Sequence, residues 1–313
     1  MKTNLAELVI ENLKKDHGGE QPETIIKKLC TDLLGQAEIK LKVSWNPPPY
    51  DPYLLAPLRN TLTIEKDDIK KGMTLLEPIT ENNFNIYYSS KSEKGNHHLR
   101  FNIALEIVKT FFKPAKSIFE ESMRKTKSDT YKKVEKLAEF GAYELLMPEE
   151  PFQKEIKKLG FTPLVCDELV EIFDVSKLMI LKRMAYLAPY PCSVVIIEYD
   201  NPQFKENSLN TKFGNHFSPS VEDLVKAKAS KTDRYRVVMS INSPGFPYKI
   251  PLNKSMPPDT IFYHAAMFKK SLSGSHLMKI ENRRVRFEVD VMSLPKSYPE
   301  EIYPPLLAFF KII

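Results

Sequence analysis

The chain has 313 residues, of which 42% are hydrophobic and 11% aromatic, so it can bury ordinary cores and is not a disordered tail. Its net charge of +6 is a mild excess that permits an acidic partner without requiring one. The three cysteines form neither a Cys-x-x-Cys pair nor an even-numbered disulfide framework, and no apolar run reaches the roughly 20 residues that span a bilayer. We expect a cytoplasmic protein with no membrane segment and two or three domains.

The N-terminal part mixes helical and strand patterns. Apolar periodicity predicts two helices within residues 1–36, the second starting near Pro22. The alternation in "AEIKLKVSW" predicts a strand over 37–45. Further short strands are predicted at 61–65 and 85–90. This order of elements indicates a mixed α/β domain.

The middle of the chain is helical. An apolar helix is predicted over 99–112, and a longer helix over 128–146 ends before Pro148. A short helix then ends at Gly160, and residues 162–187 split into two helices at "DVS".

Strand patterns dominate after residue 190. One helix is predicted over 220–230, and the apolar end "PPLLAFFKII" is too short to span a membrane and is expected to dock on a core. The predicted strands cover 193–199, 234–241, 260–267, 276–281 and 284–292. We therefore expect three domains, 1–150, 151–190 and 191–313.

The stretch "RFNIALEIVKTFF" carries a single charge pair, Glu106 and Lys109, one helical turn apart. A zinc peptidase has His-Glu-x-x-His on such a helix, because residues i and i+4 share one face and both imidazoles reach one ion. Residues 99–187 resemble the ImmA/IrrE family of metallopeptidase-like regulators. The resemblance rests on "LRFNIALEIVKTFF", on "VEKLAEFGAYELLMPEE" and on the helix-turn-helix with "FDVS".

The resemblance implies a zincin-like domain whose zinc-ligand positions are degenerate. Leu105 and Lys109 stand where the two histidines would be, and Leu137 stands at the position of the third ligand. Only Glu106, the general-base position, is kept. Neither leucine nor charged lysine offers a lone pair to a metal, so we expect no zinc, no other cofactor and no catalysis at this site.

Two interpretations of the Glu106–Lys109 pair remain open. The lysine could supply the positive charge that a metal once gave to a partly buried carboxylate, or both residues could lie on a solvated edge. An active metallopeptidase with unorthodox ligands could use residues such as His97, His98 and Glu106, with Asp129 and Glu135 further along the chain. The other interpretation of these histidines is a polar, solvated helix start.

Two sets of cations suggest contacts with anions. On the second helix of the pair, residues 176–187, Lys177, Lys182 and Arg183 are expected to be exposed and could contact DNA, although in this family the segment is often architectural. In the strand-rich part, cationic faces of neighbouring strands could form an anion-binding sheet. The residues of that predicted face are Arg234, Arg236, Arg284 and Arg286. An ordinary half-exposed strand would have the same pattern.

The leading functional hypothesis is a non-catalytic pseudopeptidase regulator that binds a protein partner. Active members of the family cleave helix-turn-helix repressors, so the resemblance implies a repressor-like partner. The order and texture of residues 191–313 resemble the GAF-like sensor that some members carry, which implies that this domain senses a signal. The alternatives are an active metallopeptidase and a DNA-binding transcriptional regulator.

Overall fold

The computed structural model of this chain describes residues 5–42, 48–69, 73–89, 96–123, 129–200, 234–294 and 304–312. The contacts divide it into two compact units, Met1–Lys154 with Leu169–Ser176 and Glu155–Glu168 with Lys177–Ile313. The functional division into 1–150, 151–190 and 191–313 stays a prediction. The helix predicted at 220–230 lies outside the described residues.

The first unit begins with two helices, α1 (Leu5–Asp16) and α2 (Pro22–Leu41), the second with proline in its first turn as predicted. The strand predicted over 37–45 is wrong where the structure describes it, because α2 continues through Leu41. Ala37 is buried, but Ile39 and Leu41 are 80% and 39% exposed, so the alternating apolar residues do not share one buried face.

A three-stranded sheet follows a short helical turn, α3 (Pro52–Leu55) and η1 (Ala56–Arg59). Its strands are β1 (Thr61–Glu65), β2 (Thr74–Pro78) and β3 (Phe84–Tyr88), which confirms the predicted strands at 61–65 and 85–90. The order is β1-β3-β2, with β3 parallel to β1 and antiparallel to β2. The strands β1 and β2 therefore form the two edges.

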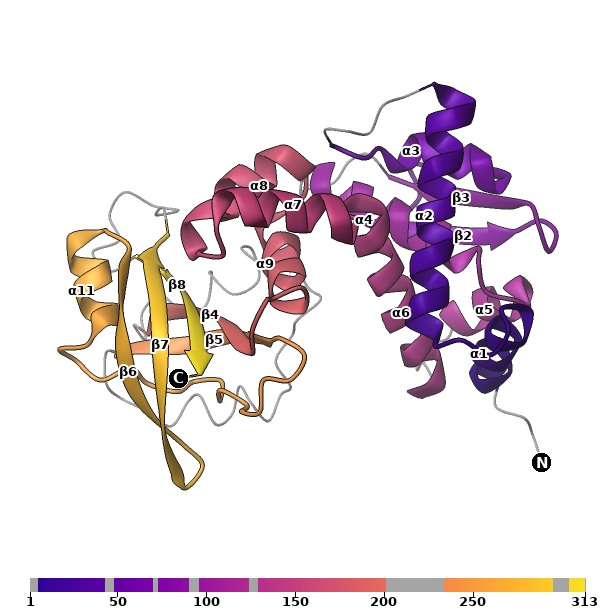
Figure 1. Ribbon diagram of the computed structural model, residues 1–313. Coiled ribbons are helices and arrows are strands. Elements are labelled where there is room, and N and C mark those ends of the chain that lie inside the picture. Colours follow the sequence, from indigo (N-terminus) through magenta and orange to yellow (C-terminus); the bar gives the residue numbers. More distant parts are fainter. Residues whose placement is uncertain are drawn as a thin grey trace. The chain divides into compact units, whose positions relative to one another are not determined.

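The helices α4 (Asn96–Lys109), α5 (Ala115–Ser122) and α6 (Asp129–Leu146) complete the core of this unit. The helix α4 lies between the sheet and α6, which also contacts α2 (Figure 1). Gly141 allows α6 to approach closely, because a Cβ there would lie 2.6 Å from Cγ1 of Val108. The predicted apolar helix thus packs against neighbours on both sides, which explains its many buried residues.

The next segment is a run of short helices. They are α7 (Glu149–Leu159), η2 (Pro163–Val165), α8 (Cys166–Phe173) and α9 (Lys177–Tyr186). The turn between α8 and α9 contains Asp174 in the left-handed conformation, with φ of 50°. None of the helices in the described ranges combines the length and the apolar character that crossing a membrane requires.

The second unit contains a five-stranded antiparallel sheet with the order β5-β4-β8-β7-β6. The C-terminal strand lies at its centre, which confirms that the apolar end docks on a core. The strand predicted over 260–267 is wrong. This segment forms α11 (Ile261–Phe268), which buries Phe262, Ala265 and Ala266 at helical spacing against one face of the sheet. The strands are β4 (Cys192–Asp200), β5 (Arg234–Asn242), β6 (Leu272–Ile280), β7 (Arg283–Ser293) and β8 (Leu306–Ile312).

Candidate functional site

Glu106 and Lys109 form a buried ion pair on the inner side of α4. The Lys109 Nζ atom lies 3.0 Å from Oε1 of Glu106, and the two residues are only 8% and 4% exposed, respectively. Of the two interpretations that the sequence left open, the solvated edge is wrong. A buried carboxylate without a compensating cation would cost several kcal/mol, so the lysine is needed for the charge of Glu106 to be tolerated here.

Residues from two other elements surround this pair. Thr74 at the start of β2 donates its hydroxyl to Oε1 of Glu106 over 3.2 Å. Burial by itself lowers the pKa of Lys109, but the Glu106 carboxylate outweighs burial and holds that pKa above its ordinary value, with help from Tyr131 and Glu135 on α6. The ammonium group is therefore charged at neutral pH. No local pattern in the sequence linked Thr74 or Tyr131 to this site, because their contacts with it are long-range.

The side chains at the zinc-ligand positions do not fit a zinc ion. Leu105 is half-buried and Leu137 is 7% exposed, and neither offers a lone pair. The Lys109 ammonium group approaches the one carboxylate oxygen that also accepts from Thr74, and its charge repels a cation. Across the described residues, no three histidine, cysteine or acidic side chains are grouped closely enough to hold a metal.

The two histidines at the start of α4 belong to a different region. The Nδ1 atom of His97 lies 3.7 Å from a carboxylate oxygen of Asp174, and Nε2 of His98 lies 3.2 Å from the amide nitrogen of Asn102. At about 1.5 Å rise per residue, His98 and Glu106 are separated by roughly 12 Å along the helix axis. They are therefore too far apart to ligate one metal ion.

Arg100 connects the apolar helix to the turn between α8 and α9. Its guanidinium pairs with the carboxylate of Asp174, and Nη2 donates to the backbone oxygen of Tyr50 over 2.6 Å. Phe152 and Phe173 pack beside each other in the same unit, with ring centroids 5.3 Å apart. The "RF" and "FDVS" phrases of the resemblance are thus in direct contact, which indicates a structural role for both.

Arg100→Met is expected to destabilise the protein by about 2–3 kcal/mol, because it removes two hydrogen bonds made by a charged and largely buried side chain. Urea denaturation measures this loss of free energy of unfolding. Lys27→Met is the control, since Lys27 also pairs with an acid, Glu149, but its side chain is 43% exposed. An equal loss in the two variants would contradict the structural role of Arg100.

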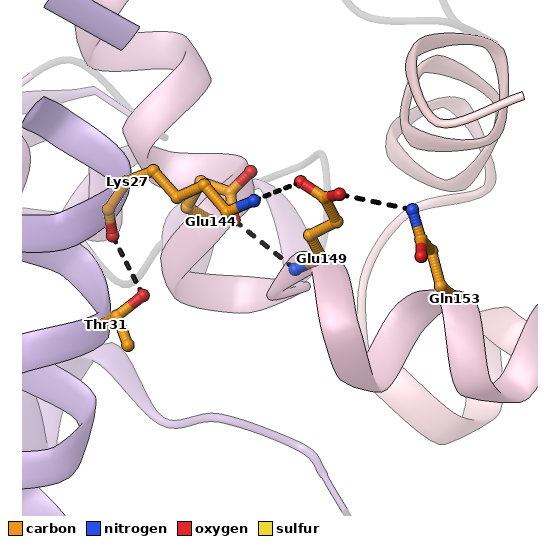
Figure 2. A network of polar contacts seen from close by, with 5 residues as sticks. All are labelled: Lys27, Thr31, Glu144, Glu149 and Gln153. Atoms are coloured by element: carbon orange, nitrogen blue, oxygen red, sulfur yellow. Dashed lines mark hydrogen bonds and ion pairs between the residues drawn. The ribbon is translucent and has the colours of Figure 1, made fainter. Parts of the chain in front are cut away.

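The "ELLMPEE" phrase caps a helix (Figure 2). A carboxylate oxygen of Glu144, at the end of α6, accepts the backbone N–H of Glu149, the first residue of α7, over 3.3 Å. The side chain of Glu149 in turn pairs with Lys27 on α2 over 2.5 Å and accepts from Gln153 over 3.2 Å. An acid at the start of a helix is favourable because the first backbone N–H groups lack partners. The most specific phrase of the resemblance therefore serves the fold.

The cations of α9 differ in exposure from what its sequence predicts. Arg183 is 1% exposed, so the expectation that it points to solvent is wrong. Lys177 pairs with the carboxylate of Asp167 on α8, and Lys182 is half-buried. The inner residues of α9 pack on β4 and β5 of the same unit. DNA binding by Lys177, Lys182 and Arg183 stays a prediction, and it would require Arg183 to leave its buried position.

The four arginines of the predicted anion-binding face lie on one side of the sheet but do not form one site. Their strands β5 and β7 are separated by β4 and β8, so they are not neighbours as predicted. Arg284 and Arg286 lie past the end of β8 at which Ile312 pairs with Phe287 of β7. Arg234 and Arg236 lie past the other end of β8, at which Leu306 pairs with Ile197 of β4. Anion binding at these residues stays a prediction for each pair separately.

One family model and one solved structure are similar to this chain. Residues 63–185 match the family described as the IrrE N-terminal-like domain. No curated protein matches the chain. A solved structure described as a Mycobacterium tuberculosis transcriptional regulator is similar at 12% sequence identity, with a TM-score of 0.44, over 98% of this chain and 81% of that one. The matched segment includes the Glu106–Lys109 pair and the Arg100–Asp174 contact.

Proposed function

We propose that this chain, whose residues 63–185 match the IrrE N-terminal-like domain, is a regulator that binds a protein partner without cutting it. The observation that carries the proposal is the buried Glu106–Lys109 pair. A general base must accept a proton from a water molecule, which a metal normally acidifies. Oε1 of Glu106 instead accepts from an ammonium group and a hydroxyl, and the neighbouring zinc-ligand positions hold side chains that could not bind the metal needed for that step.

The strand β2 is the edge of the sheet that lies next to this pair. Its partner β3 is antiparallel, and the backbone N–H of Ile79 bonds to the oxygen of Asn83 in the connecting turn. Hydrogen-bonded pairs alternate in such a ladder, so the backbone groups of Thr74 and Leu76 are directed away from β3. Such an edge can receive an extended peptide as an added strand, and this requires no metal.

The resemblance to the ImmA/IrrE family suggests a helix-turn-helix repressor as the partner. A signal-sensing role of the C-terminal sheet, which resembles a GAF-like sensor in order and texture, belongs to the same proposal. We do not propose an active metallopeptidase, because His97 and His98 are too far from Glu106 along α4. Binding of DNA by α9 is not proposed either, because Arg183 is buried.

The test is affinity capture of the full chain, tagged at one end, from cells of its native host, followed by mass spectrometry. We expect a repressor-like protein of full mass to be recovered. Purified partner incubated with the chain, with and without added zinc, is expected to keep that mass. Recovery of no such protein, or a partner that is cut, would overturn the proposal.

Two variants separate binding from catalysis. Glu106→Gln is expected to leave the mass of the partner unchanged, as the native chain does. Glu77→Gln is the matched control, since Glu77 is a half-buried acid on β2 that bonds to the hydroxyl of Tyr87 over 2.7 Å. A cut that disappears in Glu106→Gln and persists in Glu77→Gln would show that the chain is an active peptidase.

A further inference from the structure

The strands β6 and β7 form a hairpin that extends beyond the rest of the second sheet (Figure 1). The strand β8 pairs with β7 only from Phe287 to Ser293, whereas β6 pairs with β7 as far as the Ile280–Arg283 pair. The segment from Leu277 to Arg286 is therefore a two-stranded ribbon. A tight turn closes it, with Glu281 in the left-handed conformation at φ of 53°.

The two faces of this ribbon differ in character. Met278, Ile280 and Val285 are buried in the core of the unit. On the opposite face Lys279 stands directly across from Arg284, and Arg286 stands across from Leu277, which is 50% exposed. All of these outer side chains point away from the core because residues alternate along a strand.

The ribbon cations are Lys279, Arg284 and Arg286 on the outer face and Arg283 at the turn, and all four are exposed. In the part of the chain that the structure describes, none of them takes part in an ion pair or a side-chain hydrogen bond. The nearby acids are Glu281 in the turn and Glu288 on β7. Like charges directly opposite on paired strands repel, so the Lys279–Arg284 pair favours an external anion.

We propose that the ribbon cations bind double-stranded nucleic acid through its phosphates. A two-stranded ribbon fits the major groove of B-DNA, which is about 12 Å wide. One arginine guanidinium group can bind two oxygens of the same phosphate. Arg284 and Arg286 are spaced roughly 7 Å apart along one face of the ribbon. The net charge of +6 assists association. This inference goes beyond the proposed function, which does not depend on nucleic acid.

The experiment is fluorescence anisotropy of a labelled 30-base-pair DNA duplex, about three helical turns long, titrated with the full chain. Measurements at about 50 and 200 mM salt give the salt dependence. Arg284→Glu with Arg286→Glu is expected to weaken binding by about 100-fold and to lower the salt slope by about 2. Both side chains are exposed, so an unchanged melting temperature will show that the fold is intact.

The matched control is Lys269→Glu with Lys270→Glu, which makes the same change of charge at two exposed lysines after α11 in the same unit. It is expected to stay within about 3-fold of the native affinity. The proposal is overturned if the native chain does not bind the DNA duplex at low salt, or if the two double variants lose the same amount of DNA affinity. A loss caused by Lys182→Glu alone would reassign binding to α9. Equal binding of anionic lipid vesicles or an acidic peptide would also refute a nucleic acid site.

Discussion

Lys109→Met is expected to destabilise the protein by about 3–5 kcal/mol, measured as the free energy of unfolding in urea at pH 7. Methionine preserves most of the volume of the lysine but leaves the Glu106 carboxylate buried at 4% exposure without a cation. The remaining hydrogen bond from Thr74 compensates for only part of the lost interaction. The ion pair would then be the feature that allows a charged residue to stay in the core of the first unit.

Two controls distinguish loss of charge from loss of packing. Adding Glu106→Gln to Lys109→Met removes the uncompensated charge and is expected to recover most of the stability. Lys158→Met breaks an ion pair at the same spacing, Glu155–Lys158, whose lysine side chain is 68% exposed, and is expected to cost below about 1 kcal/mol. If Lys109→Met costs no more than Lys158→Met, charge replacement by the lysine is wrong.

The pH dependence of this effect has a definite sign. Because the pKa of Lys109 is raised in the folded protein, its contribution is complete below the unfolded value of about 10.4 and disappears as the pH rises through the folded value. The difference between native protein and Lys109→Met is therefore expected not to decline between about pH 7 and 9 and to shrink only above about 10.4. A difference that declines steadily from pH 7 to 9 would contradict this assignment.

The second large effect concerns metal binding. Purified without a chelator or a histidine tag, the native chain is expected to carry almost no zinc or manganese, even after incubation with zinc. The triple variant Leu105→His, Lys109→His and Leu137→Glu restores the ligand types that the resemblance implies and is expected to bind about one zinc per chain. Elemental analysis of both proteins measures this change.

The variant Leu105→His with Leu137→Glu serves as a control for this gain of metal. It keeps the Lys109 ammonium group, which repels a divalent cation, so it is expected to bind zinc much more weakly than the triple variant. A native protein that already carries about one zinc per chain would refute the loss of the metal site.

Sequence patterns predicted most of the local structure, and the errors have identifiable causes. The strand expected over 37–45 followed apolar residues such as Ile39 that are in fact exposed on a helix. The strand expected over 260–267 is a helix, because an apolar run of that length has no clear period. The expected exposure of the Arg183 side chain was wrong, because a helical pattern does not include the contacts that α9 makes with distant parts of the chain.

The sequence by itself determined the match of residues 63–185 to the IrrE N-terminal-like domain and the kinds of side chain at the zinc-ligand positions, because both depend only on residue identity and spacing. It left open whether Glu106 and Lys109 are solvated, since their spacing on a helix is the same in both cases. Only the tertiary structure decided this, by packing β2 and α6 around the pair. It also separated the four arginines, because the order and register of strands in a sheet depend on contacts between distant segments.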